Sequence, residues 1–367
     1  YAVTRKGKPI ITPSRLGFLF TDEAKIERRL TITGQEVRDF DETWTQPWGE
    51  WTSIRNRYRE FKVHLKETTA LARVFTVTGV ISVAKAPEAV AAWAQRRFGV
   101  AVDAEREVLL LVGSQEGTAH LPLAVLNPGD RALLLDPYYP SHRGGLQLAS
   151  AQPQLLPLEA ANGFAPALDR LSASQWDALK LMVLGFPHNP TATTGQQAWV
   201  DAAAERAVRH GLVFAHDNPY VDLALDGEAP ALLRSPHWRQ CGIEFFSFSK
   251  GWCLGGYRLA FAIGAEPLIT ALRQLKGVVD FNQSLALQAG AIAALEQAPD
   301  WPERLRPIYR ERRDRMAAAL AAAGWPVRLP SMALYLWLEL PPAARAAGLD
   351  AEGFCGRLLE ATGVCLT

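Results

Sequence analysis

Long apolar runs, clustered cysteines and an excess of charge of one sign are all missing from this sequence. No apolar run approaches the roughly 20 residues of a transmembrane helix, and no signal peptide is visible at the start. The 39 basic and 38 acidic residues give a net charge of +1, which does not favour a nucleic-acid partner. The four cysteines form no CxxC pair, and no HExxH or Cys/His cluster suggests a metal. We therefore expect a cytoplasmic protein with reduced thiols and no metal site.

Composition changes near residue 85. Residues 1–80 are poor in alanine and hold short alternating or β-branched pieces, such as FKVHLKET at 61–68. After this point, alanine-rich segments alternate with short apolar runs. The pattern predicts an antiparallel β segment over 1–80, a large α/β domain over 86–300, and a smaller α/β domain over 301–367. The last of these is predicted from a helix pattern at 307–324 and a strand pattern, ALYLWLEL, at 333–340.

Seven nearly continuous apolar runs predict the strands of the large domain. Runs that are apolar on both faces and separated by helices are typical of a mostly parallel sheet with helices on both sides. The predicted strands span residues 108–113, 132–136, 153–158, 179–186, 211–217, 243–248 and 257–264. Ligands of such sheets bind beyond the carboxyl ends of the strands, so the polar residues that follow each run are functional candidates.

Several of these strand ends carry useful chemistry. GSQEG at 113–117 opens a helix with free backbone N–H groups that favour an anion, although it also fits a plain tight turn. Tyr139 could stack on a planar ligand or pack on proline, and Asn189 could bind a ligand oxygen or initiate a turn. Asp217 needs a cationic partner or a capping role, and Tyr220 could face the same cleft.

The sixth run continues into SFSKGWCLGGYR, which places a lysine between two hydroxyl side chains and an arginine. Lys250 follows a run that should be buried, so it must pair with a carboxylate, shift its pKa or take part in chemistry. Ser247, Ser249 and Arg258 suit a phosphate, because a guanidinium offers a forked and permanent charge. Jointly the strand ends match the needs of pyridoxal 5′-phosphate: an anion cradle, a stacking ring, an amide, a carboxylate and a lysine.

The order and spacing of GSQEG, DPYYPSH, HNPTATTG, DNPY and SFSKGWCLGGYRLAFAIG resemble the class I/II pyridoxal-phosphate aminotransferases of fold type I, over residues 86–367. The aspartate and LL-diaminopimelate aminotransferase-like branch is the most similar. The resemblance implies a homodimer that moves an amino group between an amino acid and a 2-oxo acid, through a Schiff base at Lys250.

The same resemblance assigns the cofactor contacts. It implies that Lys250 is also the proton shuttle, Asp217 the partner of the pyridinium nitrogen and Tyr139 the stacking ring. Asn189 and Tyr220 would bind the ring hydroxyl. The phosphate would be held by the backbone amides of Ser114 and Gln115 and by the side chains of Ser247, Ser249 and Arg258.

Residues 1–80 resemble a different family, the N-terminal β-sandwich region of glycoside hydrolase family 97, through PSRLGFLF, FDETWTQPWGE and IRNRYREFKVHLKET. This segment stands where aminotransferases have their N-terminal arm, and we expect the arginine motif for the substrate carboxylate to lie beyond ATGVCLT. The alternatives are a pyridoxal-phosphate lyase or decarboxylase, an inactive chimera, or a carbohydrate-related β-domain. The last would need paired carboxylates, and the adjacent Asp41 and Glu42 would point to opposite faces of a strand.

Overall fold

A computed structural model describes most of the chain after residue 84. The described residues are 85–325 and 327–366, with the short segments 2–3, 9–10, 30–32 and 61–63. The carboxylates Asp41 and Glu42 and the strand pattern RVFTVTG lie outside the described residues.

The chain divides into two compact units, one of Tyr1–Ala89 with Ser284–Ala298 and the other of Val90–Gln283 with Pro299–Thr367. In the first unit, β1 (Ala2–Val3) pairs with β2 (Pro9–Ile10), and β3 (Leu30–Ile32) pairs with β4 (Phe61–Val63). Both pairs are antiparallel, as predicted for this segment. This unit also holds α12 (Leu285–Gln297).

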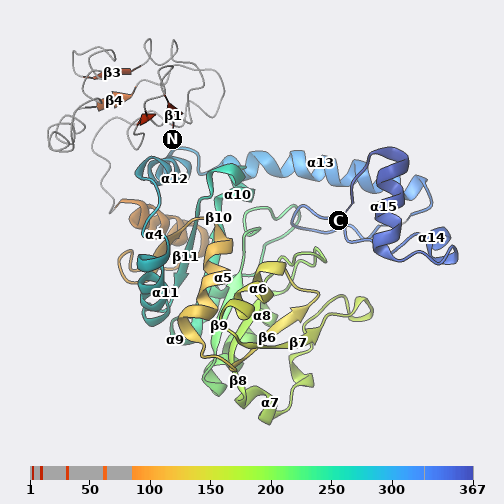
Figure 1. The fold of residues 1–367 in the computed structure, drawn as a ribbon, viewed down its shortest axis with the longest axis horizontal. Helices are drawn as coiled ribbons and strands as arrows, with labels where there is room; N and C mark the ends of the chain where they lie inside the picture. The colour runs from red at the N-terminus through yellow and green to blue at the C-terminus, as the bar shows by residue number, and fades with distance from the viewer. Residues whose placement is uncertain are drawn as a thin grey trace. The chain divides into compact units, whose positions relative to one another are not determined.

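One seven-stranded sheet forms the centre of the second unit, in the order β5-β11-β10-β9-β8-β6-β7 (Figure 1). Its strands are β5 (Val108–Leu111), β6 (Arg131–Asp136), β7 (Gln152–Pro157), β8 (Leu179–Leu184), β9 (Val213–Asp217), β10 (Gly242–Ser247) and β11 (Ala260–Gly264). Neighbours are parallel except where β11 pairs with β10 and β5. The predicted mostly parallel sheet is confirmed, and each predicted run supplies one strand.

The described helices besides α12 surround this sheet or follow it in the chain. They are α4 (Lys85–Phe98), α5 (Ser114–Val125), α6 (Pro140–Leu148), α7 (Ala173–Asp177), α8 (Gln197–His210), α9 (Trp238–Cys241), α10 (Phe248–Gly251), α11 (Glu266–Val279), α13 (Trp301–Ala322), α14 (Pro342–Ala346) and α15 (Ala351–Thr362). Within the described part of the chain, no helix is long and apolar enough to cross a bilayer.

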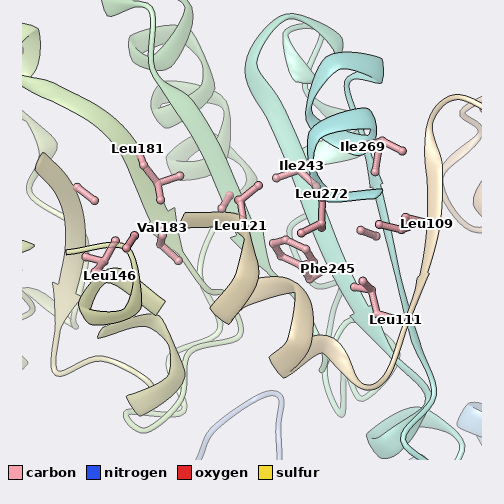
Figure 2. Close-up of a cluster of buried hydrophobic side chains, with 14 of the residues drawn as sticks. Leu109, Leu111, Leu121, Leu146, Leu181, Val183, Ile243, Phe245, Ile269 and Leu272 are labelled. Carbon is pink, nitrogen blue, oxygen red and sulfur yellow. The ribbon is translucent and has the colours of Figure 1, made fainter. Parts of the chain in front are cut away.

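Helices α5, α6 and α11 cover one face of the sheet. Leu121 of α5, Leu146 of α6 and Leu272 of α11 share one buried apolar cluster with Leu111 and Phe245 of the strands (Figure 2). Burying a side chain of this size stabilises the fold by roughly 1.5–3 kcal/mol. Because these contacts fix the helices against the strand bodies, the polar residues at the strand ends are held in defined places.

Two predictions for the C-terminal residues are wrong in detail. The helix predicted at 307–324 instead spans Trp301–Ala322, and Pro302 is compatible with its first turn, where a backbone N–H has no intrahelical partner. The strand predicted at 333–340 does not form; in the described structure this stretch has no ladder, and nearby Met332 makes only an isolated bridge to Ala224. Alternating side chains favour a strand, but a strand also requires a neighbouring backbone to share its hydrogen bonds.

Candidate active site

All ten residues predicted to form a cofactor site line one cavity of about 170 Å³ at the carboxyl ends of the parallel strands. They are Ser114, Gln115, Tyr139, Asn189, Asp217, Tyr220, Ser247, Ser249, Lys250 and Arg258. The cavity is also lined by His142, His188 and Tyr335, which the sequence did not single out. The structure therefore brings the predicted residues together, while their roles toward a cofactor stay predictions.

A larger cavity of about 520 Å³ lies between the turn 191–194 and residues 325–345. Its lining includes Arg328, Glu339 and Arg345, which carry charge of both signs. None of the ten predicted residues lines it. We take the smaller cavity as the candidate site, because its lining combines a buried carboxylate, a lysine and an anion cradle.

One end of the smaller cavity is built to receive an anion. Helix α5 begins at Ser114, directly after Gly113, so its first backbone N–H groups face this end without helical partners. Gly113 has φ 78° and ψ 152°, and an added Cβ would lie 2.3 Å from Nη2 of Arg258. The glycine is required because it lets the backbone and the guanidinium approach each other closely. Ser247 and Ser249 line the same cavity as Arg258 and add two hydroxyl groups to it.

Asp217 is the most informative residue of the site. It ends β9, is 7% exposed, and its Oδ2 lies 3.0 Å from Nε2 of His142. Its other oxygen, Oδ1, is buried and has no hydrogen-bond partner within the described structure. An unpartnered buried carboxylate oxygen is costly, so this atom marks the place of a hydrogen-bond donor from a ligand.

Tyr220 and Asn189 lie close together at another side of the cavity. Both contact the hydroxyl of Tyr335: the Tyr220 and Tyr335 oxygens are 2.5 Å apart, and Nδ2 of Asn189 donates to the Tyr335 oxygen at 3.4 Å. Burial, followed by the nearby Tyr335, raises the pKa of Tyr220 above its ordinary range. Tyr220 therefore stays protonated and can donate a hydrogen bond.

Lys250 lies in α10, a single turn that follows β10, and is only half-buried. Its Nζ lies 5.9 Å from the ring centroid of Tyr220, and no carboxylate forms an ion pair with it among the described residues. The sequence left three alternatives for this lysine: an ion pair with a carboxylate, a shifted pKa or a role in chemistry. The first is not observed among the described residues. Tyr139 precedes α6, and burial, with a smaller contribution from Asp217, raises the pKa of its phenol.

Two histidines that the sequence did not single out support these groups. His142 is the last residue of DPYYPSH, lies in the first turn of α6 and contacts Asp217 directly. His188 is buried, and its Nδ1 lies 2.8 Å from the hydroxyl of Thr191. Burial and the neighbouring His142 lower the pKa of His188 to about 3. His188 is therefore neutral at ordinary pH. Its position beside Asn189 was visible in HNPTATTG, but its burial was not.

Comparison with known proteins shows the family to which this arrangement belongs. The family model for aminotransferase class I and II matches residues 55–367. The chain belongs to this family. It is 39% identical to the LL-diaminopimelate aminotransferase of Desulforudis audaxviator over 280 residues, which is 76% of this chain and 70% of that protein. It is 35% identical to the glutamate-pyruvate aminotransferase of Escherichia coli over 281 residues, 76% of this chain and 68% of that protein.

The fold agrees with this membership. A solved structure of a probable N-succinyldiaminopimelate aminotransferase from Thermus thermophilus matches with a TM-score of 0.71 at 38% identity. The match covers 77% of this chain and 75% of that chain. The protein is thus a pyridoxal-phosphate-dependent aminotransferase of fold type I, an enzyme whose substrates are amino acids and 2-oxo acids.

The beginning of the chain is similar to a second family. The family model for the glycosyl-hydrolase 97 N-terminal region matches residues 1–79, as the sequence resemblance predicted. The aminotransferase match begins at residue 55, so the two matches overlap over 55–79.

The residues of the cavity fit pyridoxal phosphate. The unpartnered Oδ1 of Asp217 is an acceptor for the N–H of a protonated ring nitrogen. The close approach of Gly113 and Arg258 at the start of α5 leaves a cradle of backbone N–H groups and a cation for a phosphate.

Proposed function

We propose that the ten residues of this cavity hold the cofactor, and that Lys250 is the amine that anchors it and moves the substrate proton. One observation carries the proposal, the presence of Lys250 and Asp217 in the same cavity. Among the described residues, no carboxylate forms an ion pair with Lys250, and no donor reaches the buried Oδ1 of Asp217. We infer that Asp217 accepts a hydrogen bond from the ring nitrogen and keeps this nitrogen protonated.

The remaining roles follow from the chemistry of each side chain. Tyr220 and Asn189 donate to the ring oxygen, and Tyr139 covers one face of the ring. The backbone amides of Ser114 and Gln115 hold the phosphate, joined by Ser247, Ser249 and Arg258. When bound, the cofactor supplies an aldehyde that holds the amino group and a protonated ring that accepts electrons from the substrate α-carbon.

Lys250 then acts as the general base and general acid. Its Nζ would take the proton from the substrate α-carbon and return it at the neighbouring carbon, while the bound cofactor would supply the electron sink for this transfer. With the cofactor bound, the same lysine would serve both halves of the transfer, in which one amino acid gives a 2-oxo acid and a second 2-oxo acid receives the amino group.

Three further points belong to the same proposal. A homodimer and a cytoplasmic location are proposed from the resemblance to the family. The division into 1–80, 86–300 and 301–367 is proposed from the change in composition.

The proposal is tested by adding pyridoxal phosphate to the purified protein and recording its absorption near 400 nm, about where a lysine-bound cofactor absorbs. We expect a band that disappears in Lys250→Ala and persists in Lys180→Ala, which removes an exposed lysine of β8. A band that survives in Lys250→Ala would refute the role of this lysine. Ping-pong kinetics with an amino acid and a 2-oxo acid would support transfer, whereas a cleaved or decarboxylated product would indicate a lyase.

A further inference from the structure

Among the residues that line the cavity, Tyr335 comes from the part of the chain beyond residue 300. It lies in the stretch that was predicted as a strand and instead runs without a ladder among the described residues. Its ring meets that of Tyr220 edge-on, with the centroids 5.7 Å apart and the planes at 83°. The side chain of Tyr335 is therefore positioned by its contact with Tyr220 and not by strand pairing in a sheet.

The hydroxyl of Tyr335 joins the two groups proposed to bind the ring oxygen of the cofactor. It lies 2.5 Å from the hydroxyl of Tyr220 and accepts from Nδ2 of Asn189 at 3.4 Å. When Asn189 donates to the Tyr335 oxygen, the Tyr335 proton is free to donate to Tyr220. The Tyr220 proton then remains available for a third oxygen.

We propose that Tyr335 is a positioning residue that orients Tyr220 and strengthens it as a donor to the cofactor's ring oxygen. The proposal rests on the proposed function, because it assumes that Tyr220 binds this oxygen. A hydrogen bond received by a hydroxyl polarises that hydroxyl, and in a poorly hydrated site each bond of a chain strengthens the next by roughly 10–30%. Tyr335 thus acts on the cofactor only through its neighbours.

Other titratable and charged groups also face this cluster and must stay unchanged in any test. They are Asp217 on β9, Lys250 in α10, Arg258 before β11, Tyr139 and His142 at the start of α6, and His188 beside Asn189. Replacing Tyr335 by phenylalanine removes one oxygen and leaves these groups and the edge-on ring contact in place.

The readout is the pH midpoint at which the absorption band of the lysine-bound cofactor changes. A hydrogen bond donated to the ring oxygen stabilises negative charge on that oxygen. The oxygen then holds the proton on the nearby Lys250 nitrogen of the lysine-bound cofactor less strongly. Loss of the donor therefore raises the pH midpoint of the band. We expect Tyr220→Phe to raise it by roughly 1 pH unit, the value of one hydrogen bond of about 1.4 kcal/mol. Tyr335→Phe is expected to raise it by roughly 0.3 pH unit, in line with the strengthening of a neighbouring bond.

The double variant decides whether the effect passes through Tyr220. If it does, Tyr335→Phe produces no further shift in the Tyr220→Phe background. Tyr309→Phe is the matched control, because Tyr309 lies on α13 with its hydroxyl against Cys253 and does not line the cavity. Its midpoint should equal that of the parent protein.

Two results would overturn the proposal: a parental midpoint in Tyr335→Phe, or additive shifts in the double variant. If the phenylalanine protein does not fold, Tyr335→Leu removes the hydroxyl without adding a titratable group. Its midpoint should then fall between those of the parent and Tyr220→Phe, and a parental value would again overturn the proposal. Failure of the proposed function looks different, because the parent itself would then show no lysine-dependent band.

Discussion

Gly113 offers the sharpest test of the anion cradle. It combines a φ of 78° and a ψ of 152° with a position where an added Cβ would lie 2.3 Å from Nη2 and 2.9 Å from Cζ of Arg258. The change Gly113→Ala therefore imposes two costs. It forces an L residue into a backbone region that is nearly restricted to glycine, and it pushes the guanidinium away from the start of α5.

The two costs affect different measurements. The backbone conformation should lower the free energy of unfolding by about 1–3 kcal/mol. Displacing Arg258 should remove the charge-assisted hydrogen bond that we propose it donates to the cofactor phosphate; a loss of about 1.5–3 kcal/mol corresponds to roughly 10–100-fold weaker cofactor binding. The first is measured by denaturant unfolding of the protein without cofactor, and the second by titration of pyridoxal phosphate followed by absorption.

Gly227→Ala is the matched control. Gly227 has a φ of 80°, but an added Cβ there would meet nothing within 4 Å among the described atoms. We expect this variant to lose about 1 kcal/mol of stability and to bind the cofactor like the parent. In an Arg258→Ala background, Gly113→Ala should cause no additional loss of affinity. Parental cofactor affinity in Gly113→Ala alone would refute the placement of Arg258 at the phosphate.

Two further predictions concern buried charge. Lys276→Met should lower the free energy of unfolding by about 3–5 kcal/mol, because Nζ of Lys276 lies 2.9 Å from buried Glu116 and 2.7 Å from Asp280. In denaturant unfolding, Glu116→Gln should recover part of that loss, and no recovery would contradict the pairing. His188, whose pKa is lowered from 6.5 to about 3, takes up a proton only in the unfolded chain as pH falls below 6.5, so its contribution to stability is lost on acidification. Between about pH 7.5 and about pH 5.5 the loss should be about 1.4 kcal/mol, and His188→Gln should remove it; an unchanged pH slope in that variant would exclude His188 as the cause.

The local signals in the sequence were sufficient for the sheet. Each run that is apolar on both faces, such as 108–113, became a strand, because burial of both faces favours a strand over other regular structure of that length. The polar residues after these runs converged for a similar reason, since the carboxyl ends of parallel strands meet at one edge. The positions of Lys250 and Asp217 at the ends of such runs were therefore enough to predict that they share a cavity.

The sequence by itself determined the strands, their polar ends and the family. Only the tertiary structure decided which partners those ends have. The contact between Tyr220 and Tyr335 joins residues 115 positions apart, and that between His142 and Asp217 joins residues 75 positions apart. Such pairs form only when elements that are distant in sequence pack together in the fold. No local sequence pattern contains that information. The stretch 333–340 shows the same limit, because its alternation favours a strand, yet strand formation depends on a neighbour elsewhere in the fold.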